Sequence, residues 1–76
     1  MHRLSVESTL LASAAYSPGP TLLELEFRDG TVYHFFDVPA DCFRQLMESA
    51  SKGAFFNRNI RNRFRHQLVA EADEQN

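Results

Sequence analysis

The segment Leu22–Phe36, with the sequence LLELEFRDGTVYHFF, decides the fold. Apolar and acidic residues alternate with a period of two from Leu23 to Phe27, which is the pattern of a strand with one buried face. Asp29-Gly30 suits the positive φ angles of a type I′ turn, and the β-branched and aromatic residues that follow are typical of a return strand. The sequence therefore predicts a β-hairpin of Leu22–Phe27 and Val32–Phe36.

A two-residue turn at Asp29-Gly30 also predicts which side chains share a face of this hairpin. It pairs Glu26 with Tyr33 and Glu24 with Phe35, and directly opposed residues point to the same face. Tyr33 and Phe35 are then expected on the acidic side, away from the leucines, as an aromatic platform like those of RNA-binding sheets. The alternative is that another strand or the final helix covers them.

Flanking segments complete an α+β domain. Leu10–Tyr16 is expected to be a first strand, ended by the Pro- and Gly-rich loop Ser17–Pro20. After Pro39, apolar residues at helical spacing predict a helix over Ala40–Ala50, followed by a left-handed cap at Gly53. That helix is expected to bury Phe43, Leu46 and Met47 against the sheet.

The segment from Ala54 to Val69 carries two competing periodicities. Read as a helix, it places three apolar residues on one side and Arg58, Arg61 and Arg65 on the other. Strand alternation competes from Arg63 onward, so we expect a short helix near Ala54–Arg61 and a last strand near Arg63–Val69. The predicted fold is a small antiparallel β-meander of about three strands, then one or two helices and a C-terminal strand.

Length and composition predict one folded domain in a reducing compartment. Seventy-six residues hold a single core, and 43% hydrophobic residues, including seven Phe, are enough to fold it. We expect residues 1–76 to form one domain with its core at about 5–69 and a disordered acidic tail at 70–76. The lone Cys42 has no disulfide partner, and no apolar run suits a signal peptide or a membrane span, which predicts a cytoplasmic protein.

Residue patterns typical of catalysis or metal binding are missing from the sequence. His2, His34 and His66 lie far apart, without the spacings that bring zinc ligands together. Each of the three glycines has a turn or a cap to explain it, and none is left for a nucleophile elbow or a phosphate loop. We therefore expect no enzyme activity, no metal, no cofactor and no small-molecule substrate.

Charge is segregated along the chain. The first 51 residues carry three arginines and seven carboxylates, whereas the stretch 52–66 has five cations and no acidic residue. We call these cations the basic block: Lys52, Arg58, Arg61, Arg63 and Arg65. Asparagines and phenylalanines are interleaved with them, a mixture that suits phosphate contacts beside base stacking. The alternative is a solvated face that pairs with the acidic half of the chain.

Short motifs follow one another along nearly the whole chain. They are Ser8, Leu10-Leu11 to Tyr16, Leu25-x-Phe27-x-x-Gly30-x-x-Tyr33-x-Phe35, Val38-Pro39, Phe43-x-x-Leu46, Ala50, Ser51, Gly53, Phe56-Asn57 and Ile60. In this order they resemble the KTSC domain, which occurs as a C-terminal extension of some bacterial lysyl-tRNA synthetases and as a free single domain. The resemblance implies RNA binding and brings no catalytic residues. The family's central Tyr-x-Tyr is here Tyr33-His34-Phe35, which lacks one phenolic hydroxyl.

Together these patterns predict a non-catalytic module that binds RNA, including tRNA, with the basic block on phosphates and Tyr33 or Phe35 as a stacking surface. The alternative is a protein-interaction module that docks a partner or a second copy of itself through exposed aromatics or a free sheet edge. No membrane association is expected under either hypothesis.

The histidine spacing generates a first prediction. The purified chain should keep its circular-dichroism spectrum in excess EDTA, because no structural metal is expected to hold it together. Loss of the spectrum in EDTA and its recovery with zinc would contradict this.

Overall fold

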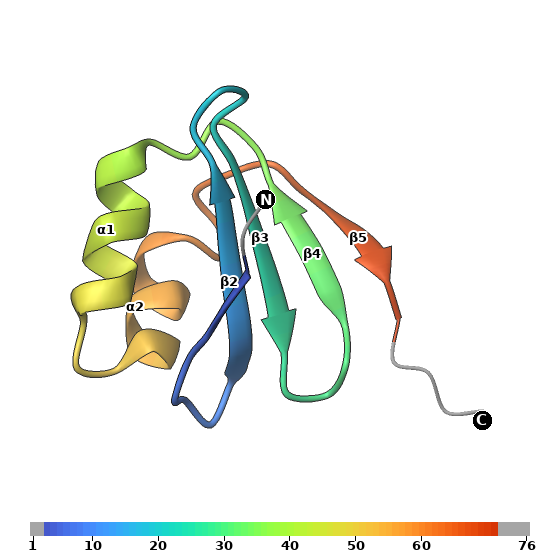
Figure 1. Ribbon diagram of the computed structural model, residues 1–76, viewed down its shortest axis with the longest axis vertical. Coiled ribbons are helices and arrows are strands. Elements are labelled where there is room, and N and C mark those ends of the chain that lie inside the picture. The colour runs from blue at the N-terminus through green and yellow to red at the C-terminus, as the bar shows by residue number, and fades with distance from the viewer. Residues whose placement is uncertain (1–2, 72–76) are drawn as a thin grey trace.

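The computed structural model describes residues 3–71 as one antiparallel sheet with two helices on one side (Figure 1). The elements are β1 (Arg3–Ser5), β2 (Leu11–Ser17), β3 (Leu22–Phe27), β4 (Val32–Phe35), α1 (Ala40–Glu48), α2 (Lys52–Asn59) and β5 (His66–Ala70). The five strands follow their sequence order across the sheet, and β4 and β5 are neighbours although both helices lie between them in the chain. The predicted α+β class is confirmed, with five strands in the sheet. The strand that the sequence did not indicate is β1, whose three exposed residues show no alternation.

The core lies between the sheet and the helices. Leu23 and Leu25 of β3 are fully buried, and Leu46 of α1 is buried with them. Phe43 and Met47 pack against the same cluster while staying partly exposed, as the helical stripe predicts. The rest of the buried cluster is Val6, Leu11, Ala14, Phe35, Val38, Phe56 and Ile60.

The β3–β4 hairpin has a different turn from the one predicted. Phe27 N donates to Thr31 O at 2.8 Å and Gly30 N donates to Phe27 O at 2.9 Å, which closes a three-residue loop, Arg28–Gly30. Gly30 adopts φ 94°, the left-handed conformation that such a loop needs at its last position. Asp29 Oδ1 accepts from both Thr31 N and Thr31 Oγ1, at 2.9 and 2.7 Å, and this bracing favours the longer loop.

That extra loop residue turns β4 over relative to the prediction. Leu25 is opposite Tyr33, Leu23 is opposite Phe35, and Glu24 is opposite His34. Tyr33 and Phe35 therefore lie on the helix side of the sheet with the leucines, and an aromatic platform on the acidic side was a wrong prediction. A shift of one residue has this effect because successive side chains of a strand point to opposite faces.

The two helices also differ in their boundaries from the prediction. The first ends at Glu48, where Ser49 N and Oγ both donate to Leu46 O, so the left-handed cap expected at Gly53 was wrong. Gly53 instead lies in the first turn of α2, where a Cβ would come within 3.4 Å of Leu10 Cβ. That distance is an ordinary van der Waals contact, so close packing does not by itself require glycine at this position.

The segment for which helix and strand were both considered forms first a helix, α2, and then a strand, β5. Ile60 N and Arg61 N both donate to Phe56 O, which ends α2, and the chain turns before β5 begins at His66. The helix and the last strand expected here are both present, although the strand starts later than Arg63. Ala70 belongs to β5, and residues 72–76 of the expected acidic tail lie outside the described residues. Among residues 3–71, neither helix is long and apolar enough to cross a membrane.

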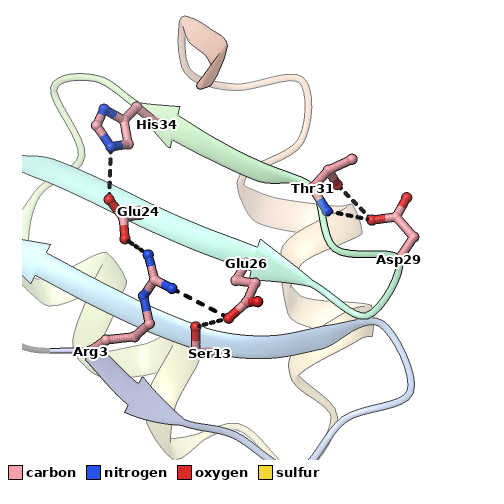
Figure 2. A network of polar contacts seen from close by, with 7 residues as sticks. All are labelled: Arg3, Ser13, Glu24, Glu26, Asp29, Thr31 and His34. Atoms are coloured by element: carbon pink, nitrogen blue, oxygen red, sulfur yellow. Dashed lines mark hydrogen bonds and ion pairs between the residues drawn. The ribbon is translucent and has the colours of Figure 1, made fainter. Parts of the chain in front are cut away.

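On the face of the sheet away from the helices, acidic side chains are paired with cationic or polar ones (Figure 2). Arg3 forms ion pairs with both Glu24 and Glu26. His34 Nε2 lies 2.9 Å from Glu24 Oε1, and Ser13 Oγ donates to Glu26 Oε1 at 2.9 Å. The hydrogen bond from Arg3 holds the pKa of Glu24 below its ordinary value. Both carboxylates of this face therefore have polar partners on neighbouring strands.

The buried leucines generate a stability prediction. Leu25→Ala should lower the free energy of unfolding by about 2–5 kcal/mol, because it leaves a cavity in a fully packed site. Urea denaturation followed by circular dichroism measures this, and Leu68→Ala on exposed β5 is the matched control, expected to cost far less. A loss below about 1 kcal/mol for Leu25→Ala would contradict the packing described, given the usual range for such changes.

The Arg3–Glu24 pair generates a pH prediction. The folded-state pKa of Glu24 is lowered, so its ionised form contributes stability above the unfolded pKa of about 4.3, and this is lost as pH falls through the folded pKa. Arg3→Met should therefore be less stable than the parent at neutral pH, with the difference shrinking in acid. Urea midpoints measured across this pH range test it, and a difference that does not depend on pH would contradict it.

Candidate functional site

A groove of about 430 Å³ lies between the C-terminal end of α2 and the helix side of β4 and β5. Its lining residues are Leu10, Phe27, Asp29, Thr31, Tyr33, Phe35, Phe56, Asn57, Arg61, Asn62 and His66. The volume falls in the range of roughly 300–1,000 Å³ typical of small-ligand sites. The groove exists because β4 and β5 extend the sheet beyond the area that α2 covers.

The floor of the groove is aromatic. Phe56 of α2 packs edge-on against Phe27 and Phe35, with ring centroids 5.3 and 5.6 Å apart. Phe35 is only 2% exposed, so it belongs to the core and supports the floor from below. His66 lies 5.4 Å from Phe35 and 5.8 Å from Tyr33 between ring centroids.

Tyr33 and His66 are the aromatic rings of β4 and β5 that a ligand can reach, and Phe27 of β3 is also partly exposed in the groove. Tyr33 is half-buried and His66 is exposed, in contrast to Phe35. Within residues 3–71 the Tyr33 hydroxyl makes no hydrogen bond, so it keeps a donor and an acceptor for a ligand. The register shift of β4 brings Tyr33 to this side of the sheet.

At the α2 end, the groove carries hydrogen-bond donors. Arg61 Nη1 donates to Asn57 Oδ1 at 3.0 Å, which orients an exposed guanidinium at the groove edge. The Asn62 side-chain amide makes no hydrogen bond within the described part of the chain. Guanidinium groups commonly donate hydrogen bonds to phosphates, and guanidinium and amide groups commonly form hydrogen bonds with base edges.

At the hairpin end, the groove carries a carboxylate. Asp29 is held by Thr31, whose hydroxyl and backbone N–H both donate to its Oδ1, as Figure 2 shows. The hydroxyl hydrogen bond is the main cause that lowers the pKa of Asp29, so this carboxyl is ionised at neutral pH. The groove lining therefore carries charges of both signs, Asp29 from the hairpin loop and Arg61 from the segment after α2.

The basic block predicted from the sequence is spread over several places. Arg61 lies at the groove, Arg58 is exposed on α2, and Arg63 is exposed in the turn after it. Lys52 lies at the far end of α2, where its Nζ donates to Ser49 O at 3.1 Å. The guanidinium carbon of Arg65 lies 4.7 Å from the centroid of the Phe36 ring, and its Nη2 lies 4.0 Å from Asp37 Oδ2.

One expectation about the basic block was wrong. Of the two alternatives, a helical continuation would have placed Arg58, Arg61 and Arg65 on one face and a strand would have paired Arg63 with Arg65, but α2 ends at Asn59 and β5 begins at His66, so neither arrangement forms. Of the residues predicted as a site, Arg61, Tyr33 and Phe35 are brought together by the groove. The sequence did not single out His66 or Asp29 as groove residues, because their positions depend on the loop length and on the start of β5.

The structure also bears on thiol reactivity and on metal binding. Burial raises the pKa of the Cys42 thiol, which keeps it protonated at neutral pH. Among residues 3–71, His, Cys, Asp and Glu side chains form no group of three or more that could hold a metal ion.

Comparisons with known proteins agree with this architecture. The KTSC domain family profile matches residues 7–64. A protein of Tsukamurella paurometabola is 37% identical over 60 residues, which cover 79% of this chain and 90% of that protein. A lysine–tRNA ligase of Nostoc sp. is 31% identical over 67 residues, which cover 88% of this chain but 12% of the ligase.

A solved structure shows the same fold. The crystal structure of a KTSC domain protein from Yersinia pestis matches with a TM-score of 0.88 at 30% identity, covering 91% of this chain and 97% of that one. The profile match covers most of the chain, and the structural match spans almost all of both molecules. The chain therefore belongs to the KTSC domain family.

Proposed function

We propose that this chain is a non-catalytic module that binds single-stranded RNA in the groove beside α2. The observation that carries the proposal is that Arg61 and the Asn62 amide lie at the edge of a groove whose floor offers Tyr33 and His66. Proteins that bind single strands combine aromatic stacking surfaces with cations that track the backbone.

The distribution of free charge supports this surface. Arg58, Arg61 and Arg63 are exposed, and within residues 3–71 none of them forms an ion pair with a carboxylate. On the other side of the sheet, Glu24 and Glu26 form ion pairs with Arg3 and not with these three arginines. They remain able to contact phosphates.

The similarity to lysine–tRNA ligases adds support from a different direction. Those enzymes act on tRNA, and the matched region is 12% of the Nostoc ligase, so the likeness concerns a part and not the whole enzyme. An RNA-contacting role for that part would be compatible with a similar role here, with tRNA as one candidate ligand.

Salt dependence tests the proposal. If each of the three arginines unpaired within residues 3–71, Arg58, Arg61 and Arg63, contacts one phosphate, the slope of log K against log salt should be about −2, because single strands release counterions at about 0.7 per contact. Changing Arg58, Arg61, Arg63 and Arg65 together to Gln should weaken binding by orders of magnitude and flatten that slope. Fluorescence anisotropy with a labelled single-stranded RNA measures both quantities.

Arg44→Gln is the matched control for the arginine variant. Arg44 is exposed on α1 and pairs with Asp41 and Glu48, away from the groove, so its removal should leave RNA affinity nearly unchanged. A folded quadruple variant with the parent's affinity would contradict the proposal.

An exposed sheet edge favours a second candidate function, the docking of a partner protein. All five residues of β5 are exposed, with Leu68 37% and Val69 44% accessible, and β5 pairs with β4 on one side. A partner strand or a second copy could add to its other side. Association that depends little on salt and is lost in Val69→Lys, measured by sedimentation, would favour this function over RNA binding.

A further inference from the structure

The groove carries charges of both signs, and they come from different elements of the fold. Arg61 lies at the α2 end, Asp29 lies in the hairpin loop, and the accessible aromatics Tyr33 and His66 lie on the same lining. A nucleotide has the matching composition, with an anionic phosphate at one end and a flat base at the other. Like charges repel, so a phosphate is favoured near Arg61 and disfavoured near Asp29.

The Asp29 carboxylate has one oxygen, Oδ2, that can accept hydrogen bonds from a ligand. Thr31 donates two hydrogen bonds to Oδ1, at 2.9 and 2.7 Å, and these hold that oxygen beside the loop. Oδ2 accepts no hydrogen bond from another side chain within residues 3–71. An ionised carboxylate has acceptors only, so it selects groups that present N–H or O–H donors.

From this arrangement we propose that the groove holds one unpaired nucleotide of an RNA strand in a single orientation. The phosphate contacts Arg61, the base stacks on Tyr33 and His66, and an amino group of the base donates to Asp29. This inference rests on the RNA binding proposed above and adds to it the class of base.

The proposal predicts a base preference. Cytosine, adenine and guanine carry an exocyclic amino group that can donate to a carboxylate, as in the pairing of Asp or Glu with cytosine N4, and uracil does not. Uracil presents a carbonyl oxygen where cytosine has this amino group, and that oxygen is repelled by the carboxylate. A base-paired strand has already used the amino group, and its bases are stacked in the duplex, so the groove should select single strands.

Short cytidine and uridine homopolymers test the proposal. The parent should bind the cytidine strand roughly tenfold more tightly, which is the lower end expected for a hydrogen bond to a charged group. Asp29→Asn keeps the size of the side chain and an oxygen for Thr31, but it removes the charge and adds a donor. In this variant the preference should fall to near equality or reverse, while the folded structure is checked by circular dichroism.

Arg61→Gln is the matched variant at the other end of the groove. It should weaken binding to both homopolymers by a similar factor and leave their ratio unchanged, because a phosphate contact is independent of sequence. Tyr33→Leu should weaken both by at least about fivefold, from the loss of a stacking partner.

The outcomes separate this inference from the function on which it rests. A parent that binds both homopolymers equally, or an Asp29→Asn variant that keeps the parent's preference, overturns the inference and leaves RNA binding in place. Failure of the parent to bind any single strand at low salt overturns RNA binding and the inference together. Equal affinity for cytidine monophosphate and the cytidine homopolymer would overturn the assignment to a strand.

Discussion

The register of the β3–β4 hairpin is the constraint on which the core and the groove both depend. Asp29 fixes that register through its two hydrogen bonds to Thr31, which hold a three-residue loop in place of a two-residue turn. With this register Phe35 joins Leu23 in the core and Tyr33 reaches the groove. A hairpin shorter by one residue would move both aromatics to the acidic face and leave the groove without its floor.

Much of the fold follows from periodicity in the sequence. Alternation over β3 correctly predicted its buried face, and the apolar stripe of α1 correctly predicted Leu46 as a core residue. Loop length was not predictable in the same way, because Asp29-Gly30 is compatible with both a two-residue and a three-residue connection. The position of Gly53 was also ambiguous, since a glycine after an apolar stripe can cap that helix or, as here, lie in the first turn of the next one.

Only part of the candidate site could be predicted from the sequence, because its residues lie far apart along the chain. The basic block is contiguous in sequence, but the end of α2 at Asn59 sends its members in different directions. The groove collects Asp29, Tyr33, Asn57, Arg61 and His66 from four separate segments. Only the pairing of strands and the docking of Phe56 on Phe27 and Phe35 bring them together. Phe35, Phe56 and Tyr33 thus contribute both to packing and to the site, whereas His66 is exposed.

The most direct test of a groove that binds RNA is an NMR titration of the labelled chain with short single-stranded RNAs of mixed sequence. Binding in the groove predicts that the largest amide shifts fall on Asp29, Thr31, Tyr33, Asn57, Arg61, Asn62 and His66. Shifts confined to the face that carries Arg3, Ser13 and Glu24, or no shifts at low salt, would contradict it.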